Sequence, residues 1–372
     1  MAVYKIFPTQ DTTLYSSYPS MNTGLDAMCE AFNAIDISGN AGIARYLTQF
    51  DNQEITDIIN NKISGSQYSA YFKNFIATAQ GINANTSIEV LPLAQQWNNG
   101  TGHYLDSPQI EDGASWYYSN YSGSGLWSVS GSYNIYGYTS SYNSTYVGPG
   151  GGNWFTTSSF RVTQSFGLRD VKDFDLNVTN TVRAWYSGSI PNYGFIIKLT
   201  SSLEFSPSQY VQPTLKYYSV DTNTIYPPTL EFRWVDYTST IPPSSSIVNT
   251  TDLKMSLAEN PGVFYPDSVN RFYINVSPLY PARVYQTSSL YTNLNYLPTS
   301  SYYAIKDLAT NEFIINFDTQ YTKISANSKG NYFDVYMSGL EPERYYKVLI
   351  KTIISGSTLI FDDDYYFKVI NG

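Results

Sequence analysis

The residues of this chain that could carry acid–base or nucleophilic chemistry are few. The 372 residues include one histidine, His103, and one cysteine, Cys29. A catalytic triad would need a serine and an aspartate beside His103, and the sequence has no Gly-x-Ser-x-Gly nucleophile motif to supply the serine. Cys29 has no partner at the spacing of a metal site. We therefore interpret His103 as a loop residue and Cys29 as a buried apolar residue.

The acidic residues form two short clusters, Glu111-Asp112 and the run 362–364. Glycoside hydrolysis needs two carboxylates about 5 to 10 Å apart across a sugar groove. Neighbours along a strand point to opposite faces, so neither cluster forms that pair by itself. We interpret residues 362–364 as a solvated hairpin turn, and we predict no catalytic residue and no enzymatic activity.

Metal binding has one weak candidate. A Ca²⁺ ion takes about six to eight oxygen ligands from a suitably folded loop, and Glu111, Asp112 and the carbonyl groups around Gly113 could supply some of them. We predict no metal site and no cofactor. Asp11, Arg45 and Asp51 are interpreted as a structural salt link.

Aromatic residues are the most prominent candidates for binding, because the chain contains 37 tyrosines. A long segment, residues 97–154, is rich in Gly, Ser and Tyr, and such a long loop in a compact domain is usually a functional or interaction surface. Four of the tryptophans fit a core: Trp97, Trp116, Trp154 and Trp185.

The other aromatic residues of this segment cannot all be core residues, since Ser and Gly surround them. Tyrosine and tryptophan rings anchor protein interfaces and also stack on sugar rings. The sequence therefore predicts an interface or glycan-binding surface made by Tyr117, Tyr118, Tyr121, Trp127, Tyr133, Tyr136, Tyr138, Tyr142 and Tyr146. We favour the interface over the glycan.

Composition limits the class of partner and compartment. The net charge is −9 and no basic stripe is present, so nucleic acid is not an expected partner. The chain has no apolar run of about 18 residues, which argues against membrane insertion, and its N-terminus lacks the pattern of a signal peptide. A single cysteine also argues against secretion through an oxidising compartment. We expect a protein made in the cytoplasm of a host cell and released by lysis as part of a particle.

Strand patterns dominate the chain, whereas charged residues make up only 14%. The organising segment is 175–197, which predicts a strand, a short helix and a second strand. Its apolar residues Val178, Val182 and Trp185 share one helical face, which must cover one end of a β-sandwich because so short a helix is unstable alone. Residues 69–79 and 86–93 are predicted as a hairpin, and residues 214–220 and 229–235 as a closing hairpin.

The domain organisation follows from a Pro/Ser-rich stretch. Residues 239–246, STIPPSSS, predict a linker between an N-terminal domain, 1–238, and a C-terminal domain, 247–372. About seven short strands in the second domain favour an Ig-like or fibronectin-like sandwich. They are expected at 253–257, 271–276, 302–308, 313–317, 332–337, 345–352 and 365–369.

Several motifs in the N-terminal part carry a family resemblance. They include Asp11-Thr12-Thr13-Leu14-Tyr15 with Asn22 and Gly24, the strand 44–51 (ARYLTQFD), the Trp-x-x-Gly-x-Gly at 97–102, Gly150-Gly151-Gly152-Asn153-Trp154, and Asn192-Tyr193-Gly194-Phe195. In this order they resemble the DNRLRE-type jelly roll, a β-sandwich related to some carbohydrate-binding modules. The resemblance implies an all-β fold, with an N-terminal jelly roll followed by the Ig-like sandwich, and does not specify a ligand.

The layout of both domains resembles virion structural proteins of T4-like marine phages, especially cyanophages. Residues 330–336 (GNYFDVY) and 343–346 (ERYY) belong to this resemblance in the second domain. It implies a location in the virion and partners among other virion proteins, on the neck or tail and in several copies.

Three functions remain open from the sequence. The first is a non-enzymatic structural component of a tailed-phage virion. The alternative is a glycan-binding module that recognises a polysaccharide on the host surface. A polysaccharide-degrading enzyme is the third, and it lacks a visible acid–base pair.

Overall fold

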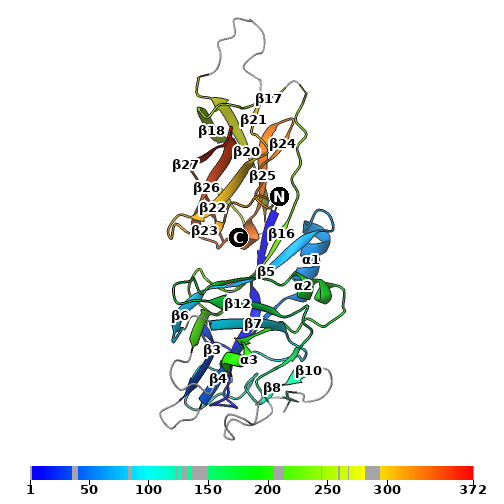
Figure 1. Ribbon diagram of the computed structural model, residues 1–372, viewed down its shortest axis with the longest axis vertical. Helices are drawn as coiled ribbons and strands as arrows, with labels where there is room; N and C mark the ends of the chain where they lie inside the picture. Colours follow the sequence, from blue (N-terminus) through cyan, green and yellow to red (C-terminus); the bar gives the residue numbers. More distant parts are fainter. Residues whose placement is uncertain are drawn as a thin grey trace, which may run out of the picture. The chain divides into compact units, whose positions relative to one another are not determined.

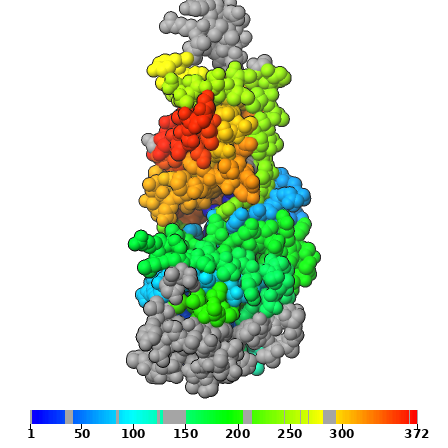
Figure 2. All heavy atoms as spheres, viewed as in Figure 1, coloured from blue at the N-terminus to red at the C-terminus, as the bar shows by residue number. Residues whose placement is uncertain are grey.

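The computed structural model describes most of the chain (Figures 1 and 2, where the other residues are grey). The described residues are 2–35, 41–82, 86–121, 125–127, 133–135, 150–204, 213–243, 245–258, 260–266, 268–280 and 294–371. Side chains are not described at 34, 35, 41, 133–135 and 364.

The chain divides into two compact units, and each contains segments that are distant in sequence. The N-terminal unit consists of Ile6–Asn61 and Ser69–Glu231. The C-terminal unit consists of Phe232–Gly372 together with Met1–Lys5 and Lys62–Tyr68.

The N-terminal unit is built on an eight-stranded sheet with the order β12-β7-β14-β4-β3-β15-β6, in which β2 also pairs with β4. Its strands are β2 (Pro8–Tyr15), β3 (Met28–Ile35), β4 (Ala41–Phe50), β6 (Ile76–Gln80), β7 (Thr86–Pro92), β12 (Val162–Phe166), β14 (Phe195–Leu199) and β15 (Thr214–Tyr218). All of these pairings are antiparallel.

A second sheet has four strands. Its order is β1 (Ala2–Ile6), β16 (Thr229–Trp234), β5 (Tyr68–Asn74) and β13 (Phe174–Asn177). Two short ribbons complete the N-terminal unit: β8 (Tyr118–Asn120) with β9 (Gly125–Leu126), and β10 (Tyr133–Ile135) with β11 (Asn153–Phe155). Among the described residues its helices are α1 (Asn52–Asp57), α2 (Thr179–Tyr186) and α3 (Ser201–Glu204), and α1 continues into a π-helical turn, η1 (Ile58–Lys62), whose last residue belongs to the C-terminal unit.

The predicted strand–helix–strand segment is confirmed as β13, α2 and β14. Val178, Val182 and Trp185 are buried, and the Trp185 ring lies 4.7 Å from the ring of Phe195 on β14. Val178 itself is the N-cap and has no capping side chain, whereas Asn177 Oδ1 accepts a hydrogen bond from the Thr179 N–H. Burial of one face, rather than a strong cap, therefore stabilises this eight-residue helix.

Both predicted hairpins are wrong, although their strands exist. β6 pairs with β15, and β7 pairs with β12 and β14, so β6 and β7 are not neighbours in the sheet. β15 and β16 likewise belong to different sheets. In both cases the strands pair with strands that are distant in sequence instead of with each other.

The C-terminal unit contains two sheets that are antiparallel except for one strand pair. One sheet has the order β18 (Leu253–Ala258), β20 (Val269–Pro278), β25 (Gly330–Tyr336) and β24 (Ser325–Asn327). The other has the order β19 (Val263–Phe264), β27 (Ser357–Val369), β26 (Arg344–Ile354), β22 (Ser301–Asp307) and β23 (Phe313–Ile315), with β19 parallel to β27. Smaller elements are the parallel pair β17 (Ser246–Ile247) and β21 (Asn295–Tyr296), and the 3₁₀ turn η3 (Met337–Gly339).

The core of the C-terminal unit lies between these two sheets. Tyr303 on β22 stacks on Phe333 of β25 with ring centroids 4.3 Å apart, and Phe272 on β20 lies 5.5 Å from Phe367 on β27. All four side chains are buried. All seven strands predicted in this part of the sequence are present, and the expected all-β fold is confirmed.

The acidic run 362–364 is not the predicted hairpin turn. It lies inside β27, where Val348 pairs with Tyr365 but Ile350 pairs with Phe361, so the run bulges opposite a single residue of β26. The turn between β26 and β27 is instead Ser355-Gly356, and both residues have positive φ values of 50° and 82°. Asp362 forms an ion pair with Lys347, which gives this carboxylate a local role.

The predicted linker, residues 239–246, makes backbone contacts within the C-terminal unit. Ser239 forms a bridge with Ala326, and the Thr240 N–H donates to the Ala326 carbonyl group at 2.9 Å. Ser246 belongs to β17.

Candidate functional site

Asn22 fixes the segment that presents the predicted tyrosines. This asparagine is fully buried, and its Nδ2 donates to the carbonyl groups of Asn99 at 2.6 Å and Ala114 at 2.9 Å. Its Oδ1 accepts from the N–H groups of Gly24 and Gly102. One side chain therefore holds residues 99–114 against the turn that follows β2.

Gly100 shows why this region needs glycine. Its φ of +81° lies in the left-handed region, and a Cβ atom there would lie 2.4 Å from Asn22 Oδ1. The glycine thus permits both the backbone conformation and the close approach of the asparagine.

A tryptophan cluster lies beneath the same segment. Trp97, Trp116 and Trp154 are buried with Leu14, Leu47 and Ile196, which confirms the prediction that these tryptophans belong to the core; Trp185, the fourth, is also buried. Arg45 on β4 extends into this cluster, and its guanidinium carbon lies 4.8 Å from the Trp116 ring centroid and 5.2 Å from that of Trp154.

The charge of Arg45 is balanced inside the fold by Glu204 of α3. Nε donates to Oε1 at 2.6 Å and Nη2 donates to Oε2 at 3.0 Å, while Nη1 donates to the Gly151 carbonyl group. Lys198 connects the same Glu204 to Glu89, at 3.1 and 2.7 Å. Burial raises the pKa of Glu204, but the cations Arg45 and Lys198 outweigh that effect and hold the pKa below its ordinary value.

The predicted salt link of Arg45 with Asp11 and Asp51 is therefore wrong. Asp51 is the N-cap of α1 and accepts from the N–H groups of Gln53 and Glu54. Asp11 accepts from the Val220 N–H at 2.7 Å. Glu204 lies 159 residues from Arg45 along the chain, so sequence proximity gave no indication of the pairing.

Three of the predicted surface residues form a group on this framework. Tyr117 and Tyr121 each expose 36% of their surface, and Tyr118 on β8 lies between them in partly buried form. The Tyr118 ring meets the Tyr121 ring edge-on at 4.9 Å and the Tyr117 ring edge-on at 6.5 Å. The Tyr117 N–H donates to the Pro19 carbonyl group, and the Tyr121 N–H donates to that of Gly113. The rings are thus exposed while their backbone is bonded to the fold.

Trp127 does not join this group. It is 3% exposed, and its indole N–H donates to the Ser115 carbonyl group at 2.9 Å, so it is a core residue like the other tryptophans. Its predicted role at a surface is a misassignment. For Tyr133 only the backbone is described, and it pairs with Phe155. Tyr136, Tyr138, Tyr142 and Tyr146 lie outside the described residues.

Four further exposed residues, which the sequence pattern does not indicate, extend the group. Tyr104 lies 5.0 Å from the buried ring of Tyr15 and 6.0 Å from Tyr18, which directly precedes the Pro19 that bonds Tyr117. Leu105 follows Tyr104, and Leu126 pairs with Tyr118 across β8 and β9. We call these seven residues the tyrosine surface: Tyr18, Tyr104, Leu105, Tyr117, Tyr118, Tyr121 and Leu126.

Three acidic residues lie in the segment that carries the tyrosine surface: Asp106, Glu111 and Asp112. Asp112 accepts from both the N–H and the hydroxyl of Thr101, and Asp106 accepts from the His103 N–H. Glu111 bonds the Tyr121 hydroxyl group, and this contact raises the pKa of Tyr121. In the described part of the chain no group of three or more Asp, Glu, His or Cys side chains gathers as metal ligands would.

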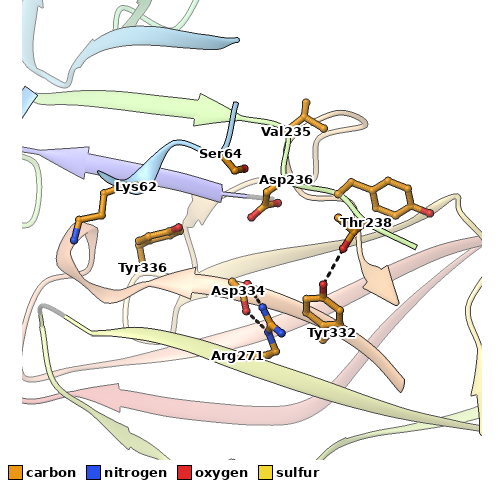
Figure 3. A pocket seen from close by; sticks show the side chains of 10 residues that line it. Lys62, Ser64, Val235, Asp236, Thr238, Arg271, Tyr332, Asp334 and Tyr336 are labelled. Carbon is orange, nitrogen blue, oxygen red and sulfur yellow. Dashed lines mark hydrogen bonds and ion pairs between the residues drawn. The ribbon is translucent and has the colours of Figure 1, made fainter. Parts of the chain in front are cut away.

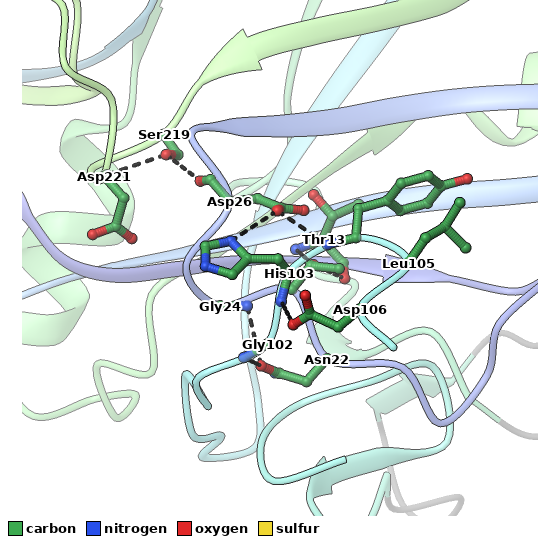
Figure 4. A network of polar contacts seen from close by, with 12 residues as sticks. Thr13, Asn22, Gly24, Asp26, Gly102, His103, Leu105, Asp106, Ser219 and Asp221 are labelled. Atoms are coloured by element: carbon green, nitrogen blue, oxygen red, sulfur yellow. Dashed lines mark hydrogen bonds and ion pairs between the residues drawn. The ribbon is translucent and has the colours of Figure 1, made fainter. Parts of the chain in front are cut away.

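His103 belongs to a polar network at the edge of this surface (Figure 4). Its Nδ1 lies 3.4 Å from Asp26 Oδ1, and the same carboxylate oxygen accepts from the Tyr104 N–H. Burial raises the pKa of Asp26, and the Tyr104 hydrogen bond and His103 lower it in part. Ser219 is buried, and its hydroxyl donates to the Asp26 main-chain carbonyl group at 2.5 Å. The network joins three loops, and the serine hydroxyl is directed to the backbone.

Cys29, the free cysteine, is buried as predicted, and burial raises the pKa of its thiol well above the ordinary value. Among the helices that the structure describes, none has both the length and the apolar character needed to span a bilayer.

Comparisons with known proteins give no family assignment. No family model matches the chain, and no curated protein matches its sequence at a significant level.

Proposed function

We propose that the protein is a non-enzymatic structural component of a tailed-phage virion, and that it docks on other virion proteins of the neck or tail through the tyrosine surface. It would be made in the host cytoplasm and reside in the particle in several copies. The proposal combines the sequence resemblance to phage structural proteins with the properties of this surface.

The observation that carries the proposal is that Tyr117 and Tyr121 are exposed, with the partly buried Tyr118 between them, while their backbone is hydrogen-bonded to the fold. Tyrosine rings supply large contact area at low entropic cost, and they are enriched where proteins bind each other. Because the Tyr117 and Tyr121 N–H groups are already bonded to Pro19 and Gly113, docking would require little further ordering of the backbone.

The proposal includes the finer layout of the two units as a jelly roll and an Ig-like domain. In the C-terminal unit it is supported by the two sheets β18-β20-β25 and β27-β26-β22-β23. It is also supported by Tyr346, which lies near the start of β26 and whose hydroxyl donates to the Glu341 carbonyl group at 2.9 Å. A tyrosine that bonds back to the chain just upstream of a strand is a feature of Ig-like sandwiches.

A test uses host cells that express tagged variants during infection by the phage that encodes the protein. The double variant Tyr117→Ser/Tyr121→Ser is expected to fold, because both rings are exposed, but to enter particles at less than about a tenth of the wild-type copy number. Tyr265→Ser/Tyr345→Ser is the matched control, since these tyrosines are more exposed, at 63% and 54%, and lie in the other unit. Normal incorporation of the first variant would overturn docking through this surface.

The same variants separate docking from glycan recognition. Tyrosines also stack on sugars, so a host-glycan module would enter particles normally after the Tyr117→Ser/Tyr121→Ser change. It would instead lose saturable binding to host-surface polysaccharide.

A further inference from the structure

The C-terminal unit contains a pocket of about 380 Å³ that plays no part in the tyrosine surface (Figure 3). This volume lies in the range of small-molecule sites, about 300–1,000 Å³. All ten lining residues belong to this unit: Lys62, Ser64, Val235, Asp236, Tyr237, Thr238, Arg271, Tyr332, Asp334 and Tyr336.

An ion pair forms one wall of the pocket. Arg271 on β20 donates through Nε and Nη2 to the two carboxylate oxygens of Asp334 on β25, at 2.7 and 2.8 Å. A carboxylate has about four acceptor sites and a guanidinium group about five N–H donors. The bidentate pair therefore uses only part of the hydrogen-bonding capacity of each group. The remaining acceptors of Asp334 and the remaining donors of Arg271 lie side by side.

Aromatic rings and a hydroxyl pair complete the wall. The Arg271 guanidinium carbon lies 4.1 Å from the Tyr332 ring centroid, and the Tyr332 and Thr238 hydroxyls are hydrogen-bonded at 2.9 Å. The Tyr336 ring meets the buried Trp234 ring at 5.4 Å, which fixes its position. Figure 3 shows Thr238 and Tyr332 beside the Arg271–Asp334 pair, and Tyr336 and Lys62 toward the other end.

The charges of the pocket indicate the class of ligand. Two cationic side chains, Lys62 and Arg271, are balanced by two anionic ones, Asp236 and Asp334. Since Arg271 is already neutralised by Asp334, and since the pocket holds side chains of both signs, a ligand of either charge would lie close to a group of like charge. A neutral ligand with many hydroxyl groups matches the mixed donors and acceptors, and an apolar ring face matches the tyrosines.

We propose that this pocket is a binding site for a neutral saccharide of one or two sugar rings. Ring hydroxyls would donate to Asp334 and accept from Arg271 and Thr238, and a sugar face would pack on the tyrosine rings. This inference goes beyond the docking proposal, because the pocket and the tyrosine surface share no residue.

Calorimetric titration of the full chain tests the proposal. The probes are four disaccharides: cellobiose, maltose, N,N′-diacetylchitobiose and, as the acidic comparison, digalacturonic acid. We expect saturable binding of at least one neutral probe and weaker binding of the acidic one. Failure of all three neutral probes to saturate, or preference for the acidic probe, would overturn the proposed ligand class.

Two substitutions assign the binding to the pocket. Asp334→Asn keeps the shape of the side chain and Thr238→Val removes one exposed hydroxyl, and each is expected to weaken binding of the neutral probe about tenfold. Asp362→Asn is the matched control, because this carboxylate also pairs with a basic residue, Lys347, but on the other sheet. Melting curves establish that the variants fold. If both pocket variants bind like wild type, the site lies elsewhere and the proposal fails, whereas incorporation into particles tests docking separately.

Discussion

Asp11 is a buried carboxyl group with an unusual proton affinity. Burial, the largest effect, raises its pKa from 3.8 to about 7, and the hydrogen bond from the Val220 N–H lowers it in part. The folded state therefore binds the Asp11 proton more tightly than the unfolded chain does. This stabilising contribution is complete below about pH 4 and is lost as the pH rises through about 7.

Replacing Asp11 by asparagine should remove that pH dependence, because asparagine resembles the protonated carboxyl group. In the wild type, the contribution of Asp11 to the free energy of unfolding should fall by roughly 2 to 3 kcal/mol between pH 5 and pH 8, and the variant should lack this fall. Urea denaturation at the two pH values measures the change. The account of Asp11 is wrong if the variant and the wild type lose stability equally over this interval.

Substitution of Arg45 tests the buried charge network that Arg45 forms with Glu204 and Lys198. Arg45→Met would leave Glu204 with one cationic partner instead of two and remove the contacts with Trp116 and Trp154. We expect a loss of about 3–5 kcal/mol in the free energy of unfolding, the usual cost of breaking a buried pair. Lys216→Met, which breaks the more exposed pair with Glu30, should cost about 1 kcal/mol or less. Equal losses in chemical denaturation would show that Arg45 is not held as described.

Contacts between loops hold the elements of the N-terminal unit in place as much as strand pairing does. The segment that presents the tyrosine surface is bonded to Asn22 across 77 and 92 positions of sequence. The helix α2 is similarly fixed by contact with β14 rather than by its own cap.

A pair of glycine substitutions measures the Asn22 contact. Gly100→Ala would place a Cβ against Asn22 and strain a φ of +81°, whereas Gly65→Ala would strain a φ of +95° with nothing within 4 Å. We expect Gly65→Ala to cost about 1 kcal/mol and Gly100→Ala at least about 3 kcal/mol. Thermal unfolding compares them. Equal stability of the two variants would show that contact between the new Cβ and Asn22 adds no cost.

Neighbouring positions on α2 give a second comparison. Trp185 is buried against Phe195, whereas Tyr186 is 42% exposed. Trp185→Ala should lower the free energy of unfolding by about 3–5 kcal/mol and Tyr186→Ala by about 1 kcal/mol or less. A similar cost at both positions in urea denaturation would contradict the role given to the helix face.

Sequence patterns predict where strands and helices lie better than they predict which strands pair with each other. The strand–helix–strand segment and the strands of the C-terminal unit follow from apolar periodicity, which is local information. The pairing of β6 with β15 depends on residues more than 130 positions apart, and no local pattern encodes it. The run 362–364 was misassigned as a turn because a bulge tolerates the same charged residues.

Only part of the candidate site can be predicted from the sequence, because local patterns do not encode contacts between distant residues. Tyr117, Tyr118 and Tyr121 are adjacent in sequence and were identified together. Trp127 lies in the same Gly-, Ser- and Tyr-rich segment, but it is buried because it packs with the tryptophan cluster, most of whose other members are distant in sequence. Tyr104 and Leu105 lie in a turn, and only the three-dimensional structure brings Tyr104 to Tyr18, whose neighbour Pro19 accepts the Tyr117 N–H.

At the scale of the molecule, each of two compact units has its own core, and two short N-terminal segments belong to the C-terminal unit. No sequence pattern indicated that residues 1–5 and 62–68 would join residues 232–372, because unit membership depends on long-range contacts. The tyrosine surface and the saccharide pocket lie in different units, so docking and ligand binding can be tested independently.

We propose that this protein is a structural component of a tailed-phage virion, and quantitative mass spectrometry of purified, intact phage particles decides whether it is. The account predicts that the full-length protein co-purifies with the particles through a density gradient, at a fixed copy number relative to the major capsid protein. Its presence in the lysate but absence from intact particles would contradict the claim that this protein is a structural component of the virion.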